Sequence, residues 1–216
     1  MSTRTPLRRD LADLKQKVYI LGEKCIEISD LYNTLLDSYS DNLEARLIDL
    51  SKEIKKETKE LNDQCFLVLT LQQPMIKDLR FVIGSLQIVL NLEKSTEQYT
   101  SIISLLSGIS IIKPELKENL KKMSDIVTTL LRTSLTLYLS FNLDLGKETS
   151  KLFSEINYMH DILYKQILKE LAVETGEKAQ IEAQLLGTIR SLEKVSDIVT
   201  NIIEQVHYII VGKTNG

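Results

Sequence analysis

The sequence is poor in residues that interrupt helices, with 8 Gly, 3 Pro and no Trp among 216 residues. So few chain-breaking residues favour few turns and long helices. There are also only two cysteines, Cys25 and Cys65, and each falls inside a helical pattern. Neither has a second cysteine at the spacing of a metal or redox site, so we expect both to be small buried residues.

An excess of basic residues is also missing, because 27 Lys and Arg stand against 30 Asp and Glu. We therefore expect no general nucleic-acid binding. The longest uncharged windows, 81–92 and 98–112, fall short of the ~20 apolar residues of a membrane span. The start, MSTRTPLRRDLADLKQK, has no apolar core of signal-peptide type, so we expect a cytoplasmic protein. Phosphate-loop, GxGxxG, GxSxG and HExxH motifs are lacking, which leaves ordinary hydrolase or kinase chemistry little to work with.

Apolar residues at gaps of three and four predict six helices. The expected ranges are 11–35, 41–71 with Asp41 as a candidate N-cap, a third helix after Pro74, a fourth to about residue 141, a fifth from about 144 to 173, and 177–211. In the third helix we expect the core-facing side to follow Leu79, Ile83, Leu86 and Leu90 and to continue into Glu93 and Glu97.

An internal repeat at an offset of one hundred residues links the two halves of the chain. The triplet LEK at Leu92 recurs at Leu192, and Ile102 and Ile103 match Ile202 and Ile203. Repeated supersecondary units of this length favour a tandem architecture over one irregular bundle. We therefore predict an elongated all-α fold, a tandem pair of antiparallel three-helix bundles with a pseudo-twofold repeat, divided into residues 1–110 and 111–216.

Acidic pairs spaced by four mark both halves. Glu93 and Glu97 form one pair, Glu193 and Asp197 the other, and residues four apart share a helical face. Asn157 and Asp161 offer a partner face on the preceding helix, and such oxygen ligands suit Mg, Ca, Mn or iron. The alternative is an ordinary solvated helix face.

A di-iron centre of the ferritin type is not expected, because that centre needs two Glu-x-x-His pairs. Glu204 and His207 supply one pair, whereas the other histidine, His160, is preceded at that spacing by Asn157.

Two segments, QQPMIKDLR at Gln72–Arg80 and LEKVSDIVTNIIEQVHYIIVGK at Leu192–Lys213, resemble the motifs of the PhoU family of phosphate-uptake regulators. The resemblance implies metal ions or clusters, divalent or iron-type, held by acidic motifs in each repeat. The implied positions are Ser51, Lys55, Glu93 and Glu97 in the first repeat and Asn157, Asp161, Glu193 and Asp197 in the second. Since Lys55 replaces a carboxylate, it could pair with Glu93 or Glu97, and we expect metal mainly in the second repeat.

The same resemblance implies a non-enzymatic adapter that lowers phosphate uptake and phosphate-starvation signalling. Its implied partners are the ATPase subunit of the phosphate transporter and a membrane-bound sensor histidine kinase, and a homodimer is expected. The alternative function is a metal-dependent enzyme or a metal store that uses the second-repeat carboxylates, which would need an open coordination position.

Overall fold

The computed structural model describes residues 5–106, 109 and 112–212. Their α-helices are α1 (Thr5–Asp37), α2 (Asp41–Gln72), α3 (Lys77–Leu106), α4 (Pro114–Ser140), α5 (Thr149–Leu171) and α6 (Glu177–Val211), with a short 3-10 helix η1 (Leu143–Gly146) before α5. No strand occurs among these residues. The prediction of a six-helix, all-α chain is confirmed.

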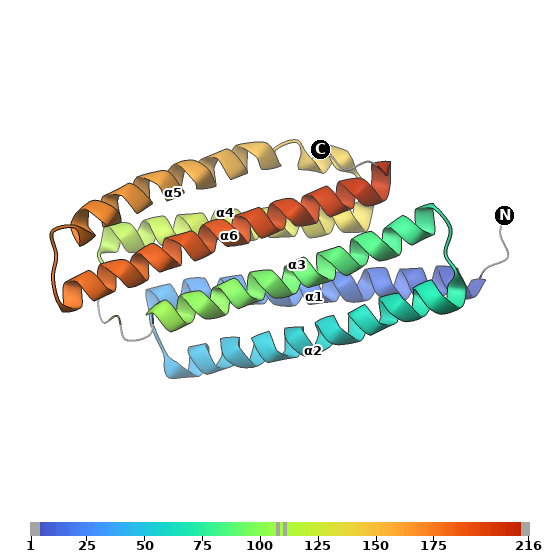
Figure 1. Cartoon of the computed structure of the whole chain (residues 1–216), viewed down its shortest axis with the longest axis horizontal. Helices are drawn as coiled ribbons and strands as arrows, with labels where there is room; N and C mark the ends of the chain where they lie inside the picture. The colour runs from blue at the N-terminus through green and yellow to red at the C-terminus, as the bar shows by residue number, and fades with distance from the viewer. Residues whose placement is uncertain (1–4, 107–108, 110–111, 213–216) are drawn as a thin grey trace.

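The helices form two three-helix bundles that lie side by side along the long axis of the molecule (Figure 1). Helices α1, α2 and α3 make one bundle, and α4, α5 and α6 make the other. The bundles meet where α3 packs on α6 and α1 packs on α4. This arrangement confirms the predicted tandem of bundles, while the expected boundary between residues 110 and 111 lies outside the described residues.

Glycines let the two bundles approach closely. A Cβ placed on Gly84 of α3 would lie 2.7 Å from Cδ1 of Ile209 in α6, and one on Gly187 of α6 would lie 2.8 Å from Cδ1 of Leu105 in α3. These two contacts lie towards opposite ends of the pair, so α3 and α6 run antiparallel. Gly22 of α1 likewise contacts the buried Leu135 of α4 closely.

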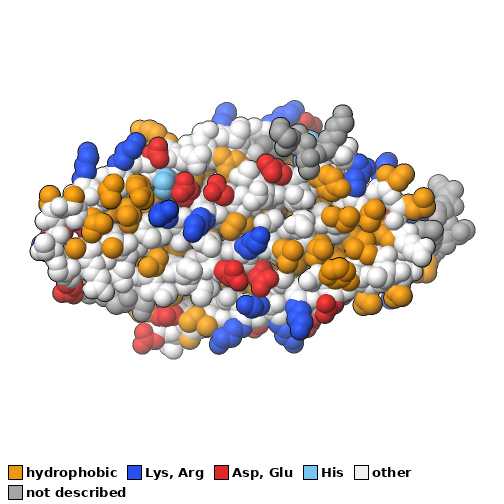
Figure 2. All heavy atoms as spheres, in the orientation of Figure 1, with side chains coloured by type: hydrophobic (Ala, Val, Ile, Leu, Met, Phe, Trp, Pro, Cys, Tyr) orange, Lys and Arg blue, Asp and Glu red, His pale blue; other side chains and the backbone are white. Residues whose placement is uncertain are grey.

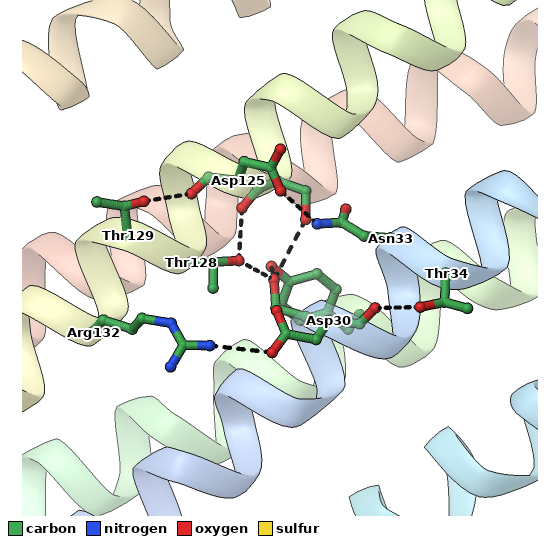
Figure 3. Close-up of polar contacts among 10 residues, drawn as sticks. Asp30, Asn33, Thr34, Asp125, Thr128, Thr129 and Arg132 are labelled. Atoms are coloured by element: carbon green, nitrogen blue, oxygen red, sulfur yellow. Dashed lines mark hydrogen bonds and ion pairs between the residues drawn. The ribbon is translucent and has the colours of Figure 1, made fainter.

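Polar contacts set the alignment of α1 against α4 (Figure 3). The Arg132 guanidinium lies 3.2 Å from the Asp30 carboxylate, and the Asn33 side-chain amide donates to Asp125 at 2.7 Å. Deeper in the same interface, the buried Ser29 hydroxyl bonds the Thr128 hydroxyl at 2.5 Å and that of Tyr99 at 2.7 Å. A satisfied buried network favours one register of the two helices over others.

The connection between α2 and α3 follows the break that proline predicts. Helix α2 ends at Gln72, Gln73 is left-handed with φ 45°, and Ile76 is left-handed with φ 38°. A β-branched residue rarely adopts positive φ, so Ile76 is strained. The side chain of Ile76 is exposed, so burial does not compensate for this strain.

Two helix starts differ from the expected ones. Ser40, not Asp41, is the N-cap residue of α2. Helix α5 begins at Thr149, later than expected, because the 3-10 helix η1 occupies Leu143–Gly146. The side chain of Asn142 caps η1 by accepting a hydrogen bond from the Asp144 backbone N–H at 3.1 Å. Short polar side chains often stabilise such turns in place of an α-helix.

The predicted core-facing side of α3 is wrong. Leu79 and Ile83 are each 37% exposed, and the buried side of the helix instead carries residues such as Val82, Ile88 and Val89. The reason is that α3 is covered by α1 and α2 on one side and by α6 on another, so its buried surface is wide and not centred on the most regular leucine spacing. The α3 stripe, which carries Leu79, Ile83, Glu93 and Glu97, therefore lies on the outer side of the helix.

Both cysteines are buried, as predicted, and burial raises the pKa of each thiol to about 12. Such thiols stay protonated at neutral pH and are poor nucleophiles. Among the described residues, no helix combines the length and the apolar character needed to cross a bilayer.

Candidate functional site

The four first-repeat positions of the predicted acidic site come together in one groove. Its volume is about 520 Å³, and Ser51 and Lys55 of α2 face Glu93 and Glu97 of α3 across it. The Thr100 hydroxyl closes part of the gap by donating to the Ser51 hydroxyl at 3.3 Å. The structure thus brings together the four positions that the family resemblance implied for the first repeat.

Charge in this groove is unbalanced. Burial raises the pKa of Glu93, the neighbouring Glu97 carboxylate raises it further, and Lys55 opposes both effects. Lys55 lines the groove, yet no ion pair joins it to either carboxylate within the described chain. The expected Lys55 pair is therefore not formed, and the Glu97 carboxylate remains close to Glu93, which disfavours ionisation of Glu93.

Glu93→Gln should therefore stabilise the protein at neutral pH. A raised pKa means that the folded state holds the Glu93 proton more tightly than the unfolded state does, so the penalty appears as pH rises through the folded pKa. We expect the thermal midpoint at pH 7 to rise by up to about 2–4 °C, the shift that about 1 kcal/mol produces at this chain length. The increase in thermal midpoint should become smaller as the pH is lowered towards ~4.3, the ordinary glutamate pKa.

Glu193→Gln is the matched control, since Glu193 holds the equivalent place in the second repeat but contacts an imidazole. Its substitution should not raise the midpoint. An unchanged or lower midpoint for Glu93→Gln at pH 7, measured by circular dichroism, would contradict the repulsion.

Two of the four second-repeat positions, Asp161 and Glu193, contact a histidine. His160 of α5 lies between two predicted ligands, with its Nε2 3.1 Å from a Glu193 carboxylate oxygen and its Nδ1 3.5 Å from an Asp161 oxygen. The contact with Glu193 is close enough for an ion pair, although it is not directed as a hydrogen bond. Asn157 is exposed on the same helix.

Sequence reasoning missed the place of His160, which was weighed only as half of a Glu-x-x-His pair. A usable signal was present, however. Matching Ser51 with Asn157 and Lys55 with Asp161 aligns His160 with Ile54, which is fully buried in the first repeat. An ionisable residue at a core position of one repeat marks a local difference in chemistry.

The α3 and α6 faces are close copies. Positions 91–100 and 191–200 show the same order of buried, half-buried and exposed side chains, with Glu93 and Glu193 half-buried and Glu97 and Asp197 exposed. Figure 2 shows acidic side chains over the middle of α3 and a separate group above it. The duplicated pairs therefore occupy equivalent surface positions in the two repeats.

The predicted metal ligands are not prearranged around a metal position in either repeat. Among residues 5–106, 109 and 112–212, no group of three or more His, Cys, Asp and Glu side chains is placed to hold a metal ion. In the second repeat the carboxylates of Asp161 and Glu193 contact different nitrogens of the His160 ring. The side chains as arranged do not fit a metal ion, and ligation by Asn157, Asp161, Glu193 and Asp197, or by Glu93 and Glu97, stays a prediction.

Comparison with known proteins gives a consistent assignment. The family model described as "PhoU domain" matches twice, at residues 18–106 and 120–206. A protein of Clostridium acetobutylicum, named phosphate-specific transport system accessory protein PhoU homolog, is 25% identical over 218 residues, which cover 98% of this chain and 97% of that protein. A homolog of the same name from Pseudomonas aeruginosa is 24% identical over 213 residues, which cover 94% and 84%.

Two crystal structures share the fold. The phosphate transport system regulatory protein PhoU of Streptococcus pneumoniae has a TM-score of 0.85 at 20% identity and covers 97% of this chain and 99% of its own. PhoU of Pseudomonas aeruginosa has a TM-score of 0.87 at 17% identity, with coverage of 95% and 99%. Both repeats therefore have counterparts in solved structures.

Proposed function

Because the chain belongs to the PhoU domain family, we propose that it is a non-enzymatic regulator of phosphate transport that lowers phosphate uptake and phosphate-starvation signalling when phosphate is plentiful. The observation that carries the proposal is the double match of the family model. It is supported by a relative that aligns over nearly its whole length and whose name places it in phosphate-specific transport. We further propose a cytoplasmic location, since both partners named below present surfaces to the cytoplasm.

The proposed partners are the ATPase subunit of the phosphate transporter and a membrane-bound sensor histidine kinase. An adapter can shift a partner between states only by binding one state more tightly than the other. The α3 stripe suits such docking, because the exposed Leu79 and Ile83 lie on the same helix face as the Glu93 and Glu97 pair. Apolar side chains beside charged ones are typical of protein interfaces.

Loss of the protein should uncouple the phosphate response. In a strain that lacks the gene, we expect a phosphate-starvation phosphatase to be expressed in high phosphate at the level that wild type reaches only in starvation. The measurement is phosphatase activity and total cellular phosphate in both media, with the gene restored on a plasmid as the control. A deletion strain that still represses the phosphatase in high phosphate would rule out the regulatory role.

A further inference from the structure

A second groove lies at the end of the molecule where α3 begins and α6 ends. Its volume is about 410 Å³, within the ~300–1,000 Å³ range of small-molecule sites. Both bundles build it: α1 and the first turn of α3 come from one repeat, and Phe141 and the last turns of α6 from the other. None of its described lining residues lines the first-repeat groove of Ser51, Lys55, Glu93 and Glu97, which we call the acidic groove.

Cations dominate the polar side of this groove. Lys15, Lys77 and Arg80 line it together with Asp78, the only carboxylate among the lining residues that the structure describes. Within the described chain no carboxylate lies within ion-pair distance of any of the three cations. The described lining of the groove therefore carries a local positive excess.

Lys15 is held inward by an aromatic ring. Its Nζ lies 3.8 Å from the centroid of the Phe141 ring, a cation–π contact that partly replaces lost hydration. Burial lowers the pKa of Lys15, as expected for an ammonium that has no counter-charge. An anion in the groove would supply that charge.

Arg80 carries an unused donor. Its Nε is buried and donates to no acceptor among the described residues. The guanidinium sits against Gly212, the left-handed residue that ends α6, where any Cβ would overlap Nη1. Buried donors nearly always have partners, so the Arg80 guanidinium, which lines the groove, lacks an acceptor that it would ordinarily have.

The rest of the groove lining is largely apolar. Phe81 and Phe141 meet edge to face with ring centroids 6.2 Å apart, and Leu11, Ile209 and Ile210 complete the wall. Figure 2 shows hydrophobic side chains gathered at this end of the molecule. An inorganic anion would engage only the cations and leave the apolar wall wet, whereas a larger ligand could use both.

We propose that this groove binds a small organic anion, with an aromatic or aliphatic body against Phe81 and Phe141 and a phosphate or carboxylate group on Lys15, Lys77 and Arg80. Since its walls come from both bundles, the ligand stabilises their present arrangement by mass action. Ligand binding in the groove is thereby coupled, through the packing of α3 on α6, to the α3 stripe proposed above to contact the partners. The site itself does not depend on the regulatory role, because binding to purified protein tests it alone.

The probe for the test is 8-anilinonaphthalene-1-sulfonate, an aromatic anion that fluoresces in apolar surroundings. We expect one saturable site per chain, weakened at least about tenfold in Lys15→Met and in Arg80→Met, and retained in Lys15→Arg. The matched control is Lys55→Met, which removes a cation from the acidic groove and should leave binding unchanged. Equal weakening by Lys55→Met, or no weakening by Lys15→Met, would overturn the proposal.

Competition identifies the head group. Displacement of the probe by phenyl phosphate or by benzoate supports a phosphate or a carboxylate ligand respectively. Displacement by neither, or by inorganic phosphate as readily as by phenyl phosphate, would contradict an organic anion site. Thermal melts followed by circular dichroism confirm that each variant is folded, and Lys15→Met keeps the test available if Arg80→Met does not fold, because Lys15 is only partly buried.

Discussion

Replacing Gly22 by leucine is expected to be among the most destabilising single substitutions in the chain. A Cβ at this position would already overlap the Cδ2 atom of Leu135 and lie 3.0 Å from its Cγ, and Leu135 is only 1% exposed. Because Leu135 is buried, any shift of its side chain must be accommodated by the neighbours packed around it. Overpacking of a close-packed interior costs about 1–3 kcal/mol, occasionally more. At this chain length that corresponds to a thermal midpoint lowered by roughly 2–12 °C.

The control for this substitution is Ala45→Leu, which adds the same kind of side chain at an exposed position of α2. Leucine and alanine have similar helix propensities, so the control midpoint should change little. A double variant, Gly22→Leu with Leu135→Ala, should recover part of the loss, because it frees the space that leucine needs. If Gly22→Leu melts at the wild-type temperature, the tight contact between α1 and α4 is not present in solution.

The sequence was sufficient for the architecture because helix periodicity and chain breaks are local signals. Pro74 predicted the end of α2, and the range 177–211 predicted α6 with the bounds that the structure has. The offset of one hundred residues also predicted equivalent helix positions for Glu93 and Glu193, and both are half-buried. Such features depend on a few neighbouring residues and on the repeat, and both are visible in a single sequence.

The parts that failed depend on packing between elements. The core-facing side of α3 was misplaced because Leu79 and Ile83 have regular spacing, yet their face is left open by the docking of α6 on another side. The role of His160 was missed because its position next to Glu193 arises from the way α5 lies on α6. The cationic groove was missed for the same reason, since Lys15 and Arg80 are brought together only when α1 packs on α3.

The second large effect is expected from neutralising the duplicated acidic pairs. We expect the combined variant Glu93→Gln, Glu97→Gln, Glu193→Gln and Asp197→Asn to raise phosphatase expression in high phosphate at least about tenfold, towards the level of the deletion strain. The four side chains are half-buried or exposed and lie on the α3 and α6 faces, so their loss removes charge without removing core. Charges on a docking face contribute to partner choice and association rate, and losing about 1.4 kcal/mol of binding weakens a complex tenfold.

A matched control changes the same kind of charge elsewhere. Glu60→Gln with Asp63→Asn neutralises two exposed carboxylates of α2 that do not line the acidic groove, and repression should persist in that variant. The control should melt at or near the wild-type temperature, and the four-site variant, which includes Glu93→Gln, should melt no lower than wild type. Normal repression by a folded four-site variant would exclude these pairs from the docking face.

Dividing the same variant into its two halves tests the metal prediction. Elemental analysis of protein purified without chelator or affinity metal should show less metal in the Glu193→Gln, Asp197→Asn half-variant than in the Glu93→Gln, Glu97→Gln half-variant. The reason is that the second repeat keeps Asp161 and adds His160 near Glu193, whereas the first repeat offers Ser51 and the cationic Lys55 in the positions of ligands. For metal to reach Glu193, the His160 ring must either leave that carboxylate or become a ligand itself, so a His160→Ala variant should change the metal content of the second repeat alone. Equal metal content in both half-variants would remove the second-repeat site, and loss of repression without any change in metal would leave the carboxylates with docking as their role.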